Sequence, residues 1–251
     1  MPRSIAPPRA GNSLILSLPR AERDSILSAC DSVELDLNQT ICEANDPIRH
    51  VYFPATAYIS LITPNDAAAS LEVGMVGSEG MFGTALLLDI KRSPFTGLVQ
   101  GSGSAFRMTA AKFKHAINDN SSFRRRLNSY FYFLTEQIAQ TAACSRFHPV
   151  DARLARWLLM AADRAHGAKF RLTHQFLAFM LGVRRAGITE AAGRLQAKNL
   201  IHYSHGVVTV LDHRGLEANS CRCYGAANRM YERSVGLARN GRARIVSDLA
   251  H

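Results

Sequence analysis

Two adjacent arginines, Arg184 and Arg185, have the side chains best suited to recognition chemistry in this chain. A guanidinium donates two parallel hydrogen bonds, so it can pair with O6 and N7 of a guanine or with phosphate oxygens. The apolar residues that follow recur at helical spacing: Ile188, Ala191, Ala192 and Leu195. The polar residues fall on the opposite face: Arg184, Arg185, Thr189, Glu190 and Arg194. The two arginines would therefore stand at the start of an amphipathic helix.

Another helix is predicted immediately upstream. Thr173 is a good N-cap, because its hydroxyl can accept a hydrogen bond from an amide of the first turn. Apolar residues then recur at helical spacing: Phe176, Leu177, Met180 and Leu181. Gly182 stands where this helix must end in a sharp turn, which a residue without Cβ makes at little cost. Residues 202–211 are predicted to form a β-hairpin with residues 204–206 at its tip.

Two crossed helices beside a hairpin form a winged helix-turn-helix, which places its second helix in the major groove of DNA. A pair of surface helices in any globular protein is the alternative. The charge distribution favours DNA. Residues 149–251 hold 16 Lys+Arg and 7 Asp+Glu, whereas residues 1–148 hold 14 and 13, so nearly all of the net charge of +10 lies in the later part. A basic domain supplies the attraction for phosphate that DNA binding needs.

The composition limits the remaining possibilities. With 251 residues, 47% of them hydrophobic, the chain can bury a core in one large or two small domains. It contains no apolar run of about 18 residues, and its start is a poor signal peptide. Five cysteines without framework spacing favour reduced thiols. We therefore expect a cytoplasmic protein that does not bind membranes.

The first half of the chain has β character. A short amphipathic helix over residues 12–31 is followed by short alternating runs separated by Gly, Pro, Asn and Asp, which indicates a compact antiparallel barrel or roll. The runs expected as strands are 33–37, 40–42, 50–53, 57–62, 70–73, 95–99 and 104–108. Thr109 is placed to cap the next helix.

A long helix is predicted from about residue 122 to 145, and it should end before Pro149. Four apolar residues follow one another at steps of four and three: Leu127, Phe131, Leu134 and Ile138. This stripe is typical of a seam with a partner helix, or of a core-facing stripe in a monomer. We favour the seam, because a long helix between two domains has little of its own chain to cover it. Helices are also expected from Val150 to Arg164 and over residues 214–240, before an Arg-rich tail from Arg239.

This order of elements resembles the Crp/Fnr family of bacterial transcription regulators. The resemblance covers roughly residues 12–215 and is carried by LTHQFLAFMLGV with the helix after it, LARWLLMAADR and VGMVGSEGMFG. It implies an α+β fold with a cyclic-nucleotide-binding-like β-roll (12–120), a dimerisation helix (121–148), a winged helix-turn-helix (149–215) and a helical extension with a tail (216–251). It also implies a homodimer on a roughly palindromic operator, with two recognition helices about 34 Å apart. RNA polymerase is a possible further partner.

The resemblance assigns roles to residues of the helix-turn-helix. It gives Arg185 the role of reading a base, with Arg184 near bases or phosphate. The residues it places on the DNA backbone and phosphates are Thr173, Gln175, Ser204 and His205.

Two departures from the family pattern concern the second helix. A frequent Glu-Thr pair is replaced here by Ala186-Gly187, and a later arginine by Glu190. Glu190 could accept from cytosine N4 or could pair with Arg194 one turn on. We therefore expect an operator that differs from the usual family site.

The roll of this family often binds a cyclic nucleotide. Residues 78–82 resemble the phosphate-binding segment, and Glu79 would be the carboxylate for the ribose. The family's arginine–serine pair falls on Phe95-Thr96, whereas Arg92-Ser93 lies three residues earlier. Without the arginine, a buried phosphodiester lacks its counter-charge. We therefore expect another small molecule, or none, and no cofactor; the candidate residues are Glu79, Gly80, Met81, Phe82, Phe95 and Thr96.

The cysteines and histidines favour no metal site. Cys30 and Cys42 are too few for a four-thiolate iron–sulfur cluster. Cys221-Arg-Cys223 could join a histidine in a metal site, but a second ligand pair is not evident from spacing. Packed, reduced cysteines are therefore preferred. A haem-ligating His148 is a less favoured alternative.

An enzyme is not expected, because the chain contains no nucleophile elbow, P-loop or HExxH motif. The predicted function is sequence-specific regulation of transcription by a DNA-binding homodimer. The alternative is a ligand-binding module of the cyclic-nucleotide-binding type that does not bind DNA, since the recognition helix departs from the family pattern.

Overall fold

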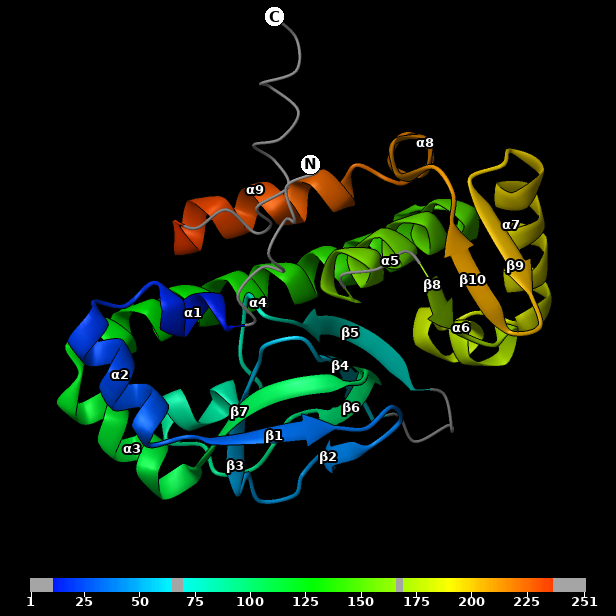
Figure 1. The fold of residues 1–251 in the computed structure, drawn as a ribbon. Helices are drawn as coiled ribbons and strands as arrows, with labels where there is room; N and C mark the ends of the chain where they lie inside the picture. Colours follow the sequence, from blue (N-terminus) through cyan, green and yellow to red (C-terminus); the bar gives the residue numbers. More distant parts are fainter. Residues whose placement is uncertain (1–10, 65–69, 166–168, 237–251) are drawn as a thin grey trace, which may run out of the picture.

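The computed structural model of the protein describes residues 11–64, 70–165 and 169–236. A β-roll lies beneath the long helix α4, the helix-turn-helix stands at one end, and the last helix runs back above α4 (Figure 1). This arrangement confirms the predicted α+β class. Among the described residues, no helix is long and apolar enough to cross a membrane.

Two short helices replace the single amino-terminal helix expected over residues 12–31. They are α1 (Ser13–Leu16) and α2 (Arg20–Ser28), and Pro19 separates them in an extended conformation. Asn12 caps α1 through its side-chain oxygen, which accepts from the Leu14 amide. Its side-chain amide donates to the carbonyls of Pro54 and Gly80, at 3.0 and 2.7 Å. One buried asparagine therefore fastens the start of the described chain to the roll.

The roll consists of two antiparallel sheets with the orders β1-β7-β3 and β2-β6-β4-β5. Its strands are β1 (Asp31–Leu35), β2 (Thr40–Cys42), β3 (His50–Pro54), β4 (Tyr58–Thr63), β5 (Leu71–Val76), β6 (Thr96–Gly101) and β7 (Gly103–Thr109). Each coincides with a run expected from the sequence, with ends that differ by up to three residues. The 3-10 helix η1 (Thr84–Leu88) lies between β5 and β6.

Polar caps set the ends of the central helices. Thr109 caps α3 (Ala110–Asp119), as expected, by accepting from the Lys112 amide at 3.3 Å. Asn120 caps α4 (Ser121–Phe147) by accepting from the Phe123 amide at 2.8 Å. His148 has an extended backbone, as a residue before proline prefers. The predicted end of the long helix before Pro149 is confirmed.

The helix-turn-helix and its wing follow α4. The elements are α5 (Val150–Ala165), β8 (Lys169–Arg171), α6 (His174–Leu181), α7 (Arg185–Ala197), β9 (Ile201–Ser204), β10 (Val207–Val210), α8 (His213–Asn219) and α9 (Cys223–Val235). β8 was not predicted, and it makes the wing a three-stranded sheet of order β8-β10-β9. The helix expected over residues 214–240 is two helices, and its end beyond residue 236, with the tail from Arg239, lies outside the described residues.

α9 runs back along α4, so the chain covers its own long helix (Figure 1). The ring of Tyr231 meets that of Phe133 edge-on at a centroid distance of 5.0 Å. The Tyr231 side chain extends past α4 to the roll, where its hydroxyl donates to the Glu79 carbonyl at 2.9 Å. A residue of the predicted carboxyl-terminal extension therefore reaches the interior of the roll.

The roll and the helix-turn-helix share one hydrophobic core. Tyr58, Ile62 and Met75 of the roll are buried with the apolar residues of α5 and α6. Glu72 of β5 lies where the roll meets α5. It accepts from the Ser60 hydroxyl at 2.6 Å and from Trp157 Nε1 at 3.0 Å. Burial raises the pKa of Glu72 from its ordinary value to about 7, although both hydrogen bonds oppose this rise.

The raised pKa of Glu72 makes stability depend on pH. The folded protein holds this proton to a higher pH than the unfolded chain does, so the stabilisation is complete below the ordinary pKa and is lost as pH rises through about 7. As the pH rises from about 5 to about 8, we expect the free energy of unfolding of wild type to fall by about 2–3 kcal/mol relative to that of Glu72→Gln. Urea unfolding at both pH values measures this difference.

The control is Glu217→Gln, which changes an exposed glutamate of α8. Its difference from wild type should be the same at both pH values. A Glu72→Gln difference that does not change with pH would contradict a raised pKa at this carboxyl group.

Candidate nucleic-acid interface

α7 buries one face and exposes the other. Its apolar residues, Ile188, Ala191, Ala192 and Leu195, are all buried, as predicted. Arg184 is the N-cap residue, with φ −70° and ψ 145°, and Arg185 begins the helix. The predicted contact residues of this segment are all exposed: Arg184, Arg185, Thr189, Glu190 and Arg194. The helix therefore presents two guanidinium groups at its amino end, where backbone amides also point outward.

α6 holds α7 in place through the turn between them. Thr173 accepts from the Phe176 amide at 3.1 Å, which confirms its expected role as the N-cap of α6. Gly182 ends α6 at φ 61°, in the left-handed region that favours glycine. Gln175, a predicted contact residue, is exposed in the first turn of α6. The local signals of the sequence therefore account for this turn.

A histidine that the sequence analysis did not single out connects three elements. The Nδ1 atom of His174 lies 2.9 Å from the Thr189 hydroxyl, and its ring stacks on that of Tyr203 at 4.3 Å. The Tyr203 hydroxyl donates to the Leu172 carbonyl at 3.1 Å. Burial, and secondarily the charge of Arg185, lowers the pKa of His174. A neutral imidazole therefore joins α6, α7 and the wing, and nothing in the sequence spacing marks it.

Two of the exposed charges on α7 have partners within the domain. Arg194 lies 3.8 Å from Glu190 and 3.5 Å from Asp151 of α5, measured between guanidinium nitrogen and carboxylate oxygen. This pairing favours the second of the two roles considered for Glu190. Arg184 and Arg185 are therefore the stronger candidates for contact with a ligand.

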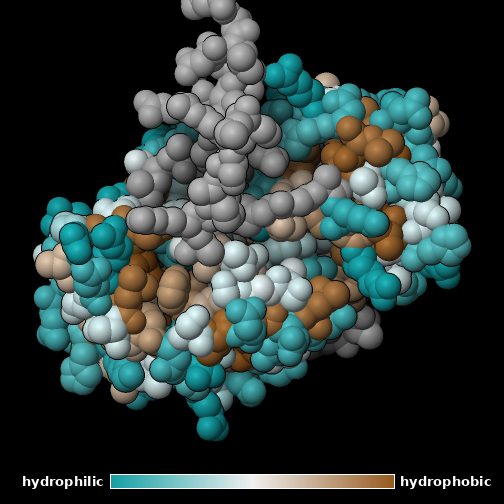
Figure 2. Space-filling view, viewed as in Figure 1, coloured by the Kyte–Doolittle hydropathy of each residue, from teal (hydrophilic) through white to brown (hydrophobic). Residues whose placement is uncertain are grey.

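The tip of the wing is a tight turn between β9 and β10. His205 and Gly206 both have positive φ values, 49° and 74°, as two-residue hairpin turns require. The Ser204 hydroxyl lies 2.8 Å from Nδ1 of His205, and His205 is exposed. Figure 2 shows that the end of the molecule where α7 lies is mostly hydrophilic on the visible face.

The four residues predicted for a dimer seam are divided between two environments. Leu127 and Leu134 are buried in the core beneath α4, so their assignment to a seam is wrong. An apolar stripe with steps of four and three also fits a helix that packs against its own chain, and here the roll covers that stripe. Phe131 and Ile138 are only half-buried.

Within the part of the chain that the structure describes, α4 keeps one open side. α9 and the segment before it cover another side, where Phe133, Glu136 and Gln140 make contacts with them. The exposed residues of the open side are Asn128, Tyr132, Thr135, Ala139 and Ala142, and they flank Phe131 and Ile138. A seam on α4 would have to use this side.

A family model for the Crp-like helix-turn-helix domain matches residues 152–219, from the first turn of α5 through the wing to the end of α8. Residues 152–219 are a Crp-like helix-turn-helix domain. No curated protein matches the sequence of the chain.

Solved structures share the fold of the chain beyond this domain. A transcriptional regulator of the Crp/Fnr family from Eubacterium rectale has a TM-score of 0.65 at 17% identity, over 82% of this chain and 97% of its own. FixK2 from Bradyrhizobium japonicum has a TM-score of 0.64 at 12% identity, over 76% and 98%. TTHB099, a CRP-family regulator from Thermus thermophilus, has 0.62 at 16%, over 83% and 98%. Together with the Crp-like domain, this shared fold confirms the resemblance to Crp/Fnr regulators.

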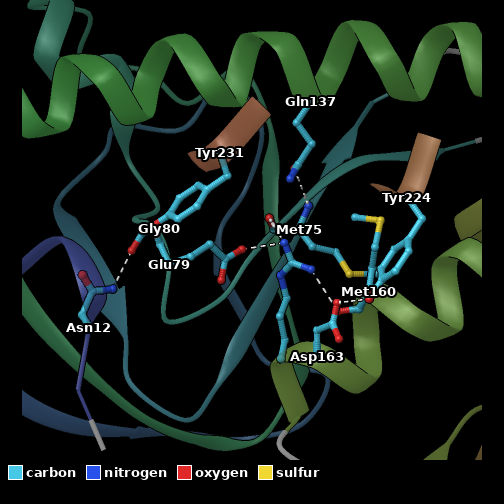
Figure 3. Close-up of polar contacts among 10 residues, drawn as sticks. Asn12, Met75, Glu79, Gly80, Gln137, Met160, Asp163, Tyr224 and Tyr231 are labelled. Carbon is cyan, nitrogen blue, oxygen red and sulfur yellow. Dashed lines mark hydrogen bonds and ion pairs between the residues drawn. The ribbon is translucent and has the colours of Figure 1, made fainter. Parts of the chain in front are cut away.

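The phosphate-binding segment expected in the roll is closed by side chains of the same chain. Glu79 forms a buried ion pair with Arg164 of α5, at 2.5 Å, so the prediction that it would bind a ribose is wrong in this structure. A Cβ on Gly80 would lie 2.2 Å from the Tyr130 hydroxyl. Met81 and Phe82 are buried in the roll. Figure 3 shows Glu79 and Gly80 beneath Tyr231, next to Met75.

A separate cavity of about 470 Å³ lies between the roll and α4. Phe95 lines it, as do Arg92 and Ser93, whereas Thr96 hydrogen-bonds to Glu43 instead. Arg92 donates to the Asn45 carbonyl at 2.5 Å, and it is the one cation among the lining residues. On the α4 side, the lining residues are Phe131, Leu134, Thr135 and Ile138. The cavity is therefore mainly apolar and reaches the open side of α4.

The ion pair between Glu79 and Arg164 should be essential for stability, because both side chains are at most 5% exposed. We expect Arg164→Met to lower the free energy of unfolding by about 3–5 kcal/mol, since it leaves a buried carboxylate without its cation. The double variant Arg164→Met/Glu79→Gln should recover much of this loss. Urea unfolding measures both values.

The matched control is Arg194→Met, which removes an arginine whose side chain is 52% exposed and whose ion pairs lie on the surface. Its cost should stay within about 1 kcal/mol. Equal costs for Arg164→Met and Arg194→Met would contradict the role of burial.

Proposed function

We propose that this protein is a sequence-specific DNA-binding regulator of transcription that acts as a homodimer. The observation that carries the proposal is the geometry of α7, whose apolar face is buried while Arg184 and Arg185 stand exposed at its amino end. In a helix-turn-helix, that end of the second helix meets the base edges. Arg185 would read a guanine, and Arg184 would contact a neighbouring base or phosphate.

The surrounding side chains support contacts with the phosphate backbone. Thr173 and Gln175 lie in the first turn of α6, and Ser204 and His205 form the wing tip. Thr189 lies on α7, and its hydroxyl is 2.9 Å from Nδ1 of His174 on α6. We assign these residues to positioning the domain on DNA, because contacts to phosphates fix orientation without reading sequence.

The dimer would form through the open side of α4. Phe131, Thr135 and Ala142 follow one another at steps of four and seven, so they share one side of the helix. The roll and α9 cover its other sides, which leaves this surface for a second copy. A two-fold axis presents the same face of both α4 helices to each other, so one surface on each copy is enough for the dimer.

The cavity between the roll and α4 is the proposed effector site. Its lining includes Phe131, Thr135 and Ile138, so an occupant would touch residues next to the dimer surface. Occupancy could in this way change how the two α4 helices pair and thus the separation of the two α7 helices. The mainly apolar lining favours an effector with a substantial apolar part. RNA polymerase as a partner stays a prediction of the resemblance, and a cytoplasmic location stays a prediction from the composition.

Substitution of Arg185 tests the proposal directly. A preferred site is first selected from random duplex DNA with wild-type protein. We then expect Arg185→Ala to weaken binding to that site by about 1–3 kcal/mol, and to relax preference at one base pair, because the bidentate contact to guanine is lost. Fluorescence anisotropy on the selected site and its single-base variants measures both effects.

The control is Arg20→Ala, which removes an arginine with a side chain that is 88% exposed on α2, far from the helix-turn-helix in the sequence. It should leave affinity nearly unchanged. Binding by wild type should also weaken steeply as salt rises. Absence of any DNA binding at low salt would favour the ligand-binding module instead. Equal weakening on all sequences would make Arg185 a phosphate contact.

A charge on the open side of α4 tests the dimer. We expect Ala142→Glu to produce monomers and to reduce affinity for a two-half-site operator, because the two-fold axis brings two like charges together. Light scattering gives the mass, and anisotropy gives the affinity. The control Ala218→Glu places the same charge on an exposed alanine of α8. A dimer that survives Ala142→Glu unchanged would exclude this surface.

A further inference from the structure

Four metal-ligating side chains meet where α4 ends. Cys144 lies in the last turn of α4, and His148 follows one turn later, with its amide bonded to the Cys144 carbonyl at 3.1 Å. Cys221 lies in the turn between α8 and α9, and Cys223 is the first residue of α9. The four candidate ligand atoms all lie within 4.8 Å of one another. The chain thus brings together pairs of ligands that are more than seventy residues apart.

The separations fit the first coordination shell of one ion. The sulfurs of Cys144 and Cys221 are 3.4 Å apart, and the Cys223 sulfur is 3.5 Å from Nδ1 of His148. Zn–S bonds of about 2.3 Å and Zn–N bonds of about 2.0 Å, in a tetrahedron, place ligand atoms roughly 3.5–3.8 Å apart. Small side-chain shifts would therefore complete the shell. Three thiolates with one imidazole form a donor set that suits zinc, whereas magnesium and calcium prefer oxygen.

The surroundings suit a charged metal centre better than a simple apolar core. The three cysteines are each at most 7% exposed, and the partly buried hydrophobic residue packed against them is Ala152. The side-chain amide of Gln140 donates to the Cys223 sulfur at 3.0 Å, an outer contact that favours a thiolate. Two buried guanidinium groups, Arg153 and Arg156, line the same small cavity as Cys144.

The guanidinium groups also balance charge. Three thiolates around a divalent ion leave one net negative charge, which is costly to bury alone. Arg156 donates to the Thr141 hydroxyl at 3.2 Å, and its buried Nε atom has no hydrogen-bond partner among the described residues. A positive group with unused hydrogen-bonding capacity therefore lies beside an anionic set of ligands.

We propose that Cys144, His148, Cys221 and Cys223 hold one structural zinc ion that fastens α9 and the end of α8 to the carboxyl end of α4. This site is independent of the proposed DNA contacts. The ion would stabilise the junction at His148–Val150, where α4 passes into α5. It would also anchor α9, which in turn places Tyr231 against Phe133 and the Glu79 carbonyl.

Metal content tests the proposal. Wild-type protein is purified under reducing conditions without chelator, supplied with zinc, desalted and analysed by inductively coupled plasma mass spectrometry. We expect about one zinc per chain, and far less than one in Cys144→Ser/Cys221→Ser. The matched control Cys30→Ser/Cys42→Ser changes the two cysteines outside the cluster and should keep one zinc.

Two further measurements do not depend on whether the cysteine variant folds. Cobalt added to metal-free wild type should give the thiolate charge-transfer band and the intense d–d bands of tetrahedral coordination. Gln140→Leu, which leaves all four ligands in place, should weaken zinc binding about 10–100-fold in competition with a chromophoric chelator. Folded wild type without stoichiometric zinc and without the cobalt spectrum would overturn the proposal. So would a Cys144–Cys221 disulfide mapped as the stable form in reduced, zinc-supplied protein.

Discussion

The packing of α4 on two of its sides is the constraint on which the rest of the structure depends. The roll buries Leu127 and Leu134, α9 covers Phe133, and Phe131 remains at the open side. A helix of 27 residues with a polar cap at its start and a proline after its end has fixed limits, so each neighbour must pack within them. Because two sides are already covered, the proposed partner and the proposed effector would both have to use the side that is left. The location of the cavity beside Phe131 and Ile138 follows from this arrangement.

Buried polar contacts also join the roll to the Crp-like domain. Glu72 accepts a hydrogen bond from Trp157, and Glu79 pairs with Arg164, so two buried carboxyl groups of the roll hold α5. Both are polar interactions in a shared apolar core, where a lost partner costs more than it would at the surface. The helix-turn-helix is therefore held against the roll in this conformation. Any change in the pairing of α4 that moves α7 must also move these contacts or carry the roll with it.

The sequence predicted features that depend on local chemistry. Thr109, Thr173 and Gly182 act on their own turns, so the helix limits and the winged helix-turn-helix could be found from spacing alone. Contacts across long separations could not. Arg164 lies far from Glu79 in the chain, and a single sequence contains no signal for that pair. The stripe through Leu127 was ambiguous because one helical pattern fits either a core or a seam, and only the position of the roll decides between them. The same limit applies to the cysteines, where a CxC pair could be seen but its partners on α4 could not.

In the proposed complex, two copies of α7 enter successive major grooves of one operator. Hydroxyl-radical footprinting of wild-type protein on a selected site measures this most directly. We expect two protected blocks, symmetric about the centre of the site and one helical turn apart, about 34 Å along the duplex. A single protected block with full affinity, or two blocks at a spacing unrelated to the helical repeat, would contradict it.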